Sequence, residues 1–129
     1  MGLLSKIFGG SDAPKDEEKL PWVELNDLNQ LDDIKEKSST KTQVIFKHST
    51  RCGISRMVKN QFESDFSFKE NHMELYFLDL IAFRDVSNTI SNLFQVVHQS
   101  PQLLVIKNGT VVAHDSHGAI NDLDLSKYI

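Results

Sequence analysis

Cys52 is the only cysteine in the chain and the residue best suited to chemistry. It lies in the run Phe46-Lys47-His48-Ser49-Thr50-Arg51-Cys52-Gly53-Ile54-Ser55, where a strand-like pattern is followed by a helix-like one. A free cysteine is often a small buried residue, but an exposed thiolate is a nucleophile that attacks disulfides. The junction favours the second interpretation. Because no internal disulfide can form, any thiol exchange needs an external partner.

The surroundings of Cys52 favour its anionic form. The first turn of a helix offers unpaired N–H groups and the positive end of the helix dipole, and both stabilise a thiolate. Basic side chains lie within about two helical turns along the chain; they are Lys47, His48, Arg51, Arg56 and Lys59. Ser55 either donates its hydroxyl to the thiolate from the same helix face or bonds local backbone. It cannot resolve a mixed disulfide.

Two neighbours of Cys52 each allow two interpretations. Gly53 either gives a partner close access to the thiol or simply tolerates the turn. His48 either raises the local potential or shuttles a proton, or else is satisfied by backbone at a strand end. His114 and His117 lack the further ligands of a metal site, so no metal is expected.

Length and composition limit the possible classes. The 129 residues, 40% hydrophobic and 25% charged, suit one globular domain. A net charge of -4 argues against a general nucleic-acid binder. A single cysteine fits a reducing compartment, and neither a signal peptide nor a membrane-spanning stretch is visible. We therefore expect a cytoplasmic protein.

The chain divides into a tail and one domain. Residues 9–19 are rich in Gly, Ser, Pro and charged residues and have little apolar surface, which is typical of a linker. We expect a flexible N-terminal tail over residues 1–20 and a folded domain over 21–129. The apolar residues near the start could dock weakly on the domain or on a partner.

Hydrophobic periodicity predicts the elements of the first half of the domain. A short strand over 22–25 should precede a helix, capped by Asn26 or Asp27, that ends near Lys37 and buries Leu28, Leu31 and Ile34. Strands are expected over 42–46 and 73–80, with a helix over 52–66 between them. The apolar residues expected to share one face of that helix are Ile54, Met57, Val58 and Phe62.

The second half continues with a helix over 85–97, in which Val86, Ile90, Leu93, Phe94 and Val97 have helical spacing. Asn108-Gly109 then joins two strands in a hairpin, because this pair suits a turn with positive φ at both positions. A last helix over 121–129 should turn Leu125, Tyr128 and Ile129 inward. The order β-α-β-α-β-α-β-β-α is that of a thioredoxin-like α/β domain with a central mixed sheet.

In this arrangement the segment Ser100-Pro101 faces the active cysteine. Proline is tolerated at the first position of a strand, and the fold favours a cis peptide bond there. The Ser100 backbone would then pair with an extended partner segment.

The Cys52 motif, together with Leu75-Tyr76-Phe77-Leu78-Asp79 and His98-Gln99-Ser100-Pro101-Gln102, resembles the YtxJ family of monothiol bacilliredoxins over roughly residues 21–120. The resemblance implies a thiol-disulfide exchange protein that removes bacillithiol from S-bacillithiolated clients. It implies catalytic roles for Cys52 and Ser55, with substrate contacts from His48, Thr50, Arg51, Gly53, Ser100 and Pro101. Members of that family often carry Pro where this chain has Gly53.

Two alternatives remain open. Cys-Gly-Ile-Ser is also similar to the Cys-Gly-Phe-Ser motif of monothiol glutaredoxins, which carry iron–sulfur clusters with glutathione. The third possibility is a redox-inactive module that binds an extended peptide. For the leading hypothesis we expect a monomer, no bound cofactor, bacillithiol or a similar small thiol as co-substrate, S-thiolated client proteins, and no nucleic-acid or membrane partner.

Overall fold

The computed structural model describes residues 20–66 and 72–129. The expected tail therefore lies outside the described residues except for Leu20, and its boundary stays a prediction. Leu20 packs, partly buried, against the hydrophobic core.

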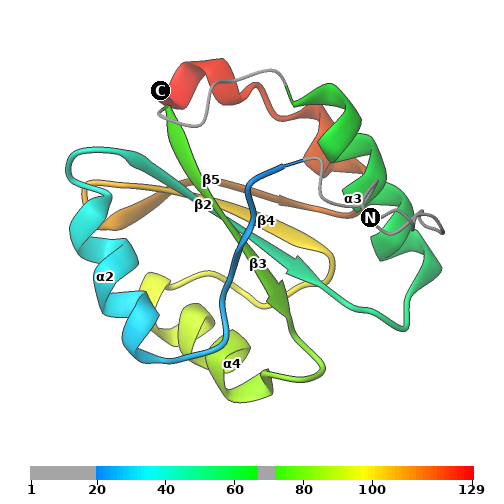
Figure 1. Ribbon diagram of the computed structural model, residues 1–129, viewed down its shortest axis with the longest axis horizontal. Helices are drawn as coiled ribbons and strands as arrows, with labels where there is room; N and C mark the ends of the chain where they lie inside the picture. The colour runs from blue at the N-terminus through cyan, green and yellow to red at the C-terminus, as the bar shows by residue number, and fades with distance from the viewer. Residues whose placement is uncertain (1–19, 67–71) are drawn as a thin grey trace, which may run out of the picture.

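A five-stranded mixed sheet forms the centre of the domain (Figure 1). Its strands are β1 (Val23–Glu24), β2 (Thr42–His48), β3 (Met73–Asp79), β4 (Gln102–Lys107) and β5 (Thr110–Ser116), in the order β1-β3-β2-β4-β5. β3 is parallel to both β1 and β2, whereas β4 is antiparallel to β2 and β5. The predicted parallel crossover and the hairpin after it are both confirmed.

Helices cover both faces of this sheet. α2 (Asn29–Lys37) and α4 (Arg84–Phe94) pack on one face, and α3 (Gly53–Asp65) packs on the other with two 3-10 helices, η2 (His117–Asp122) and η3 (Leu125–Tyr128) (Figure 1). Successive strand residues point to opposite faces. On β2, Ile45 therefore joins the core under α2 and α4, while Val44 and Phe46 join the core under α3.

The start of α2 differs in part from the prediction. The N-cap of α2 is Leu28, which makes no side-chain capping bond, and neither Asn26 nor Asp27 holds that position. Asp27 still joins the first turn, since its Oδ1 accepts the Asn29 N–H at 2.8 Å while Gln30 Oε1 accepts the Asp27 N–H at 3.0 Å. Leu28, expected inside, is 44% exposed because it lies in the capping turn. The buried residues of α2 are Leu31 and Ile34.

Two other helix predictions need correction. α4 ends at Phe94 because Gln95 takes the left-handed conformation, with φ 58°, and Val97 is 80% exposed. The last α-helix is replaced by two 3-10 helices. They are separate because Asp124 accepts the Ser126 N–H at 3.1 Å and starts a new turn. Leu125 is buried and Tyr128 packs on the core, but Ile129 is 50% exposed.

Candidate functional site

Cys52 is the N-cap residue of α3, as its place in the sequence predicted. Its backbone is extended, with φ −110° and ψ 120°, and its side chain makes no capping hydrogen bond. The Cys52 N–H donates to Ser49 O at 3.1 Å, and Cys52 O accepts the Arg56 N–H at 3.2 Å. Cys52 as a residue is partly exposed. The backbone of Cys52 is thus held at the helix start while its sulfur stays available for reaction.

Gly53 is the first residue of α3 and is exposed. Its φ is not in the left-handed region, and a Cβ added to it would meet no heavy atom within 4 Å. The turn therefore does not require a glycine. The interpretation that Gly53 admits a partner to the thiol stays a prediction.

His48 and Ser55 form a buried pair beneath the turn that carries Cys52. His48 Nδ1 lies 2.7 Å from Ser55 Oγ, and Ser55 Oγ also accepts the Ser49 N–H at 3.1 Å. Ser55 is fully buried and His48 is 6% exposed. Ser55 bonds local groups, which fits one of its two interpretations, and His48 bonds a side chain. The roles of both residues toward the thiol stay predictions.

Burial lowers the pKa of His48, and the nearby cations Lys59 and Arg56 lower it further, while the carboxylates of Asp79 and Glu63 oppose them. Lys59 is itself held by Glu63, with Nζ 2.9 Å from Oε2. His48 is consequently neutral at pH 7, and its ring nitrogen can serve as a hydrogen-bond acceptor for Ser55.

Lys47 does not join the basic group expected around Cys52. It is fully buried on the opposite face of β2, where its Nζ lies 3.4 Å from Ser87 O and 3.3 Å from His98 Nδ1. The alternation of strand side chains separates Lys47 from His48, although the two are adjacent in sequence. The sequence motif suggested one cluster of basic side chains near Cys52, but the sheet places Lys47 and His48 on opposite faces.

Ser100 and Pro101 lie at the same end of the central strands as Cys52. β4 runs antiparallel to β2, and Gln102 pairs with Lys47, so the residues before β4 lie beside those after β2. The Ser100–Pro101 peptide bond is cis, as predicted, and Pro101 is buried. Among residues 20–66 and 72–129, the Ser100 backbone has no hydrogen-bond partner, and its buried Oγ has none either.

The turn before Cys52 supplies the remaining candidates. Thr50 and Arg51 are both exposed, so each is accessible to a bound molecule. Thr50 O accepts a hydrogen bond from the Arg56 guanidinium at 3.5 Å, which links the turn to the first turns of α3.

The apolar face expected on this helix is not buried as a whole, because Ile54 and Met57 are 55% and 67% exposed. The inner face of α3 is instead formed by Ser55, Val58 and Phe62, at helical spacing. The pattern of apolar residues in the sequence did not reveal this buried face, because one of its members, Ser55, is polar. The first turns of α3 therefore present apolar side chains to solvent next to Cys52.

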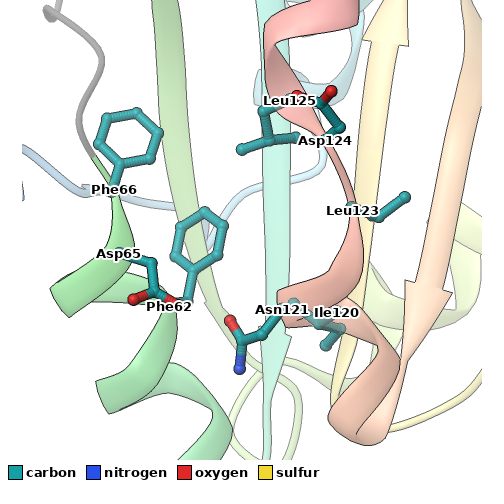
Figure 2. A pocket seen from close by; sticks show the side chains of 8 residues that line it. All are labelled: Phe62, Asp65, Phe66, Ile120, Asn121, Leu123, Asp124 and Leu125. Atoms are coloured by element: carbon teal, nitrogen blue, oxygen red, sulfur yellow. The ribbon is translucent and has the colours of Figure 1, made fainter.

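A cavity of about 190 Å³ lies on the α3 face of the sheet, away from the Cys52 turn (Figure 2). Phe62 of α3 and Phe66, the residue after α3, line one side, and the chain from Ile120 to Leu125 lines the other. None of the site residues expected from the sequence lines it. Within the described part of the chain, no three His, Cys, Asp or Glu side chains gather as a metal site. No helix there has both the length and the apolar character to cross a bilayer.

Comparison with known families agrees with this geometry. The model of the monothiol bacilliredoxin BrxC family matches residues 23–125. The chain belongs to this family. The match spans every β-strand and α-helix of the domain and includes Cys52, Ser55 and Ser100–Pro101.

Solved structures give the same fold for this bacilliredoxin. A protein assigned as an oxidoreductase with a thioredoxin fold is 31% identical, with a TM-score of 0.69 over 82% of this chain and 91% of that one. The thioredoxin of Fasciola hepatica is 16% identical, with a TM-score of 0.65 over 82% and 98%. The thioredoxin of Schistosoma mansoni is 18% identical, with a TM-score of 0.64 over 84% and 95%. Family and fold together support a thiol redox role.

Proposed function

We propose that this protein removes bacillithiol from S-bacillithiolated proteins through Cys52. The observation that carries the proposal is a partly exposed cysteine at the N-cap of α3 in a chain with no second cysteine. A lone thiol can accept a small thiol but cannot expel it by forming an internal disulfide. Membership of the monothiol bacilliredoxin family supports bacillithiol as that small thiol.

The exchange is balanced in thiols and disulfides. The Cys52 thiolate attacks the bacillithiol sulfur of the client's mixed disulfide, so a Cys52–bacillithiol disulfide forms and the client's S–S bond breaks. The client sulfur leaves as a thiolate and takes a proton from solvent. Cys52 is oxidised as the client cysteine is reduced. A second small thiol then attacks the Cys52 mixed disulfide, which releases a small-molecule disulfide and restores Cys52.

The surface around Cys52 suits a protein client. The unpaired Ser100 backbone can add an extended client segment by main-chain hydrogen bonds. Ile54, Met57 and Val97 expose apolar surface on the α3 side and on the segment before Ser100. In this proposal Thr50, Arg51 and Gly53 contact the bound thiol from the turn. The protein acts as a monomer in the reducing cytoplasm and needs no cofactor besides the thiol.

The proposal is tested by intact-mass spectrometry of a transfer reaction. The reduced protein is mixed with a client that carries one bacillithiol, and a parallel reaction uses the same client carrying glutathione. We expect the client to lose bacillithiol while this protein gains the mass of one bacillithiol. Cys52→Ser should gain no mass, and Ser64→Ala, on the exposed face of α3, should behave as the wild type.

The alternative outcomes are distinct. No transfer from either client would contradict thiol exchange, and transfer of glutathione alone would contradict the bacillithiol assignment. A coloured dimer after anaerobic incubation with iron and sulfide would indicate the iron–sulfur carrier instead. Unchanged function of Cys52→Ser in cells would indicate the redox-inactive peptide-binding module.

A further inference from the structure

Lys47 is buried without a compensating charge. Its side chain is fully buried on the α4 face of β2, and no carboxylate of residues 20–66 or 72–129 forms an ion pair with it. Burial lowers the pKa of Lys47 to about 8, so its amine is mostly protonated at pH 7. A buried ammonium is costly unless hydrogen bonds satisfy it. The contacts of Lys47 must therefore satisfy its buried ammonium.

Lys47 connects α4 to the segment that leads to Ser100. Its Nζ lies 3.4 Å from Ser87 O and 3.3 Å from His98 Nδ1, and Ser87 Oγ lies 3.3 Å from the same His98 nitrogen. A lysine ammonium has donors and no acceptor. His98 Nδ1 must therefore accept, which requires a neutral imidazole with its proton on Nε2.

Other contacts hold the same segment from the sheet. Gln102 Nε2 donates to Val97 O at 3.0 Å, Ser116 Oγ donates to Gln99 Oε1, and the His117 N–H donates to Pro101 O at 3.1 Å. The Lys47–His98 contact differs from these because it links the segment to β2, the strand that leads directly to Cys52.

We propose that Lys47 and His98 are positioning residues, forming an anchor that holds the Ser100 backbone in place for pairing with the client. This inference rests on the proposed exchange function. The anchor works only with neutral His98. A protonated ring would lose its acceptor nitrogen and would bring a positive charge close to Lys47 of β2 and Arg84 of α4.

The pH dependence follows from this geometry. Burial lowers the pKa of His98, and the charges of Lys47 and Arg84 lower it further. A group whose folded-state pKa is lowered contributes its stabilisation above its ordinary pKa and loses it as pH falls through the folded value. The rate of exchange with protein clients should therefore decrease when the pH drops below the ordinary histidine pKa of 6.5, because protonation of His98 opens the anchor.

Three variants test the anchor. Lys47→Met keeps the buried volume but removes the donor; His98→Ala removes the acceptor; and His98→Asn keeps an acceptor near the Nδ1 position that cannot take a proton. KM and kcat are measured with an S-bacillithiolated protein, and the rate of Cys52 alkylation by iodoacetamide is measured at the same pH. Lys107→Met, at the far end of β4, is the control.

We expect Lys47→Met and His98→Ala to raise KM for the protein client about tenfold, the effect of about one lost charge-assisted hydrogen bond. Alkylation of Cys52 should stay within about twofold, because the reagent does not pair with Ser100. His98→Asn should restore KM at pH 7 and weaken the fall in exchange at acid pH.

Wild-type KM in folded Lys47→Met and His98→Ala, checked by thermal unfolding, would overturn the anchor. Should Lys47→Met not fold, the pair His98→Ala and His98→Asn decides the question by itself. An inactive wild-type protein would instead overturn the proposed exchange function, so the two failures are distinguishable.

Discussion

Ser55 is a fully buried hydroxyl that joins two segments beneath the Cys52 turn. Its Oγ lies 2.7 Å from His48 Nδ1 at the end of β2 and accepts the Ser49 N–H at 3.1 Å in the turn. One bond satisfies the buried His48 ring, and the other satisfies the N–H of Ser49, which is partly buried. Ser55 thus ties the turn that carries Cys52 to the end of β2.

Replacing Ser55 with Ala should destabilise the domain. The change leaves the Ser49 N–H and the His48 Nδ1 without partners, and a buried unsatisfied polar group costs about 1–3 kcal/mol. Urea unfolding at pH 7 measures this cost, with Ser64→Ala on the exposed face of α3 as the control. A loss no larger than that of the control would show that the two bonds contribute nothing to stability.

At the scale of elements, the β4–β5 hairpin depends on two consecutive residues in the left-handed region. Asn108 has φ 52° and Gly109 has φ 80°. The hairpin tip is also bonded to the end of α2, since the Asn108 N–H donates to Ser38 O and the Gly109 N–H donates to Ser38 Oγ, both at 2.8 Å. The turn therefore fixes both the register of the strands and their position against α2.

Gly109→Ala should cost about 1–2 kcal/mol, because residues with a Cβ are disfavoured in the left-handed region. The cost would come from the backbone and not from a clash, since the nearest atom to the added Cβ is Lys35 Cε at 3.6 Å. Gly118→Ala is the matched control, with open space and no positive φ. Equal midpoints for the two variants in urea unfolding would contradict this explanation.

At the scale of the whole molecule, one sheet separates two cores and connects them. The side chains of β2 and β4 alternate between the core under α2 and α4 and the core under α3. Leu104 belongs to the first core and its neighbours Leu103 and Val105 to the second. Because each central strand contributes to both cores, a destabilising substitution in one core should lower the stability of the whole domain.

Leu104→Ala should lower the free energy of unfolding by about 2–5 kcal/mol, since Leu104 is fully buried. Leu28→Ala, at a side chain that is 44% exposed, should change it by less than about 0.5 kcal/mol. Urea unfolding followed by tryptophan fluorescence and by circular dichroism gives both values. Trp22 packs against the other core, so a fluorescence transition separate from that seen by circular dichroism would contradict a single cooperative unit.

Much of the fold was predictable because its signals are local. The spacing of Leu31 and Ile34, the apolar runs of β3 and β4, and the Asn108-Gly109 turn each act within a few residues. The helix ends were less predictable, since Leu28 and Val97 depend on where a capping bond or a left-handed residue stops the helix. The C-terminal turns depend on one Asp124 contact in the same way.

The sequence by itself determined that one thiol stands at a helix start without a second cysteine, and that exchange must involve another molecule. Only the tertiary structure decided which neighbours act together with Cys52. Strand alternation and sheet pairing place His48 with Ser55 on one face and Lys47 with Ser87 and His98 on the other. Contacts between residues far apart in the chain depend on that packing, and local sequence patterns do not encode them.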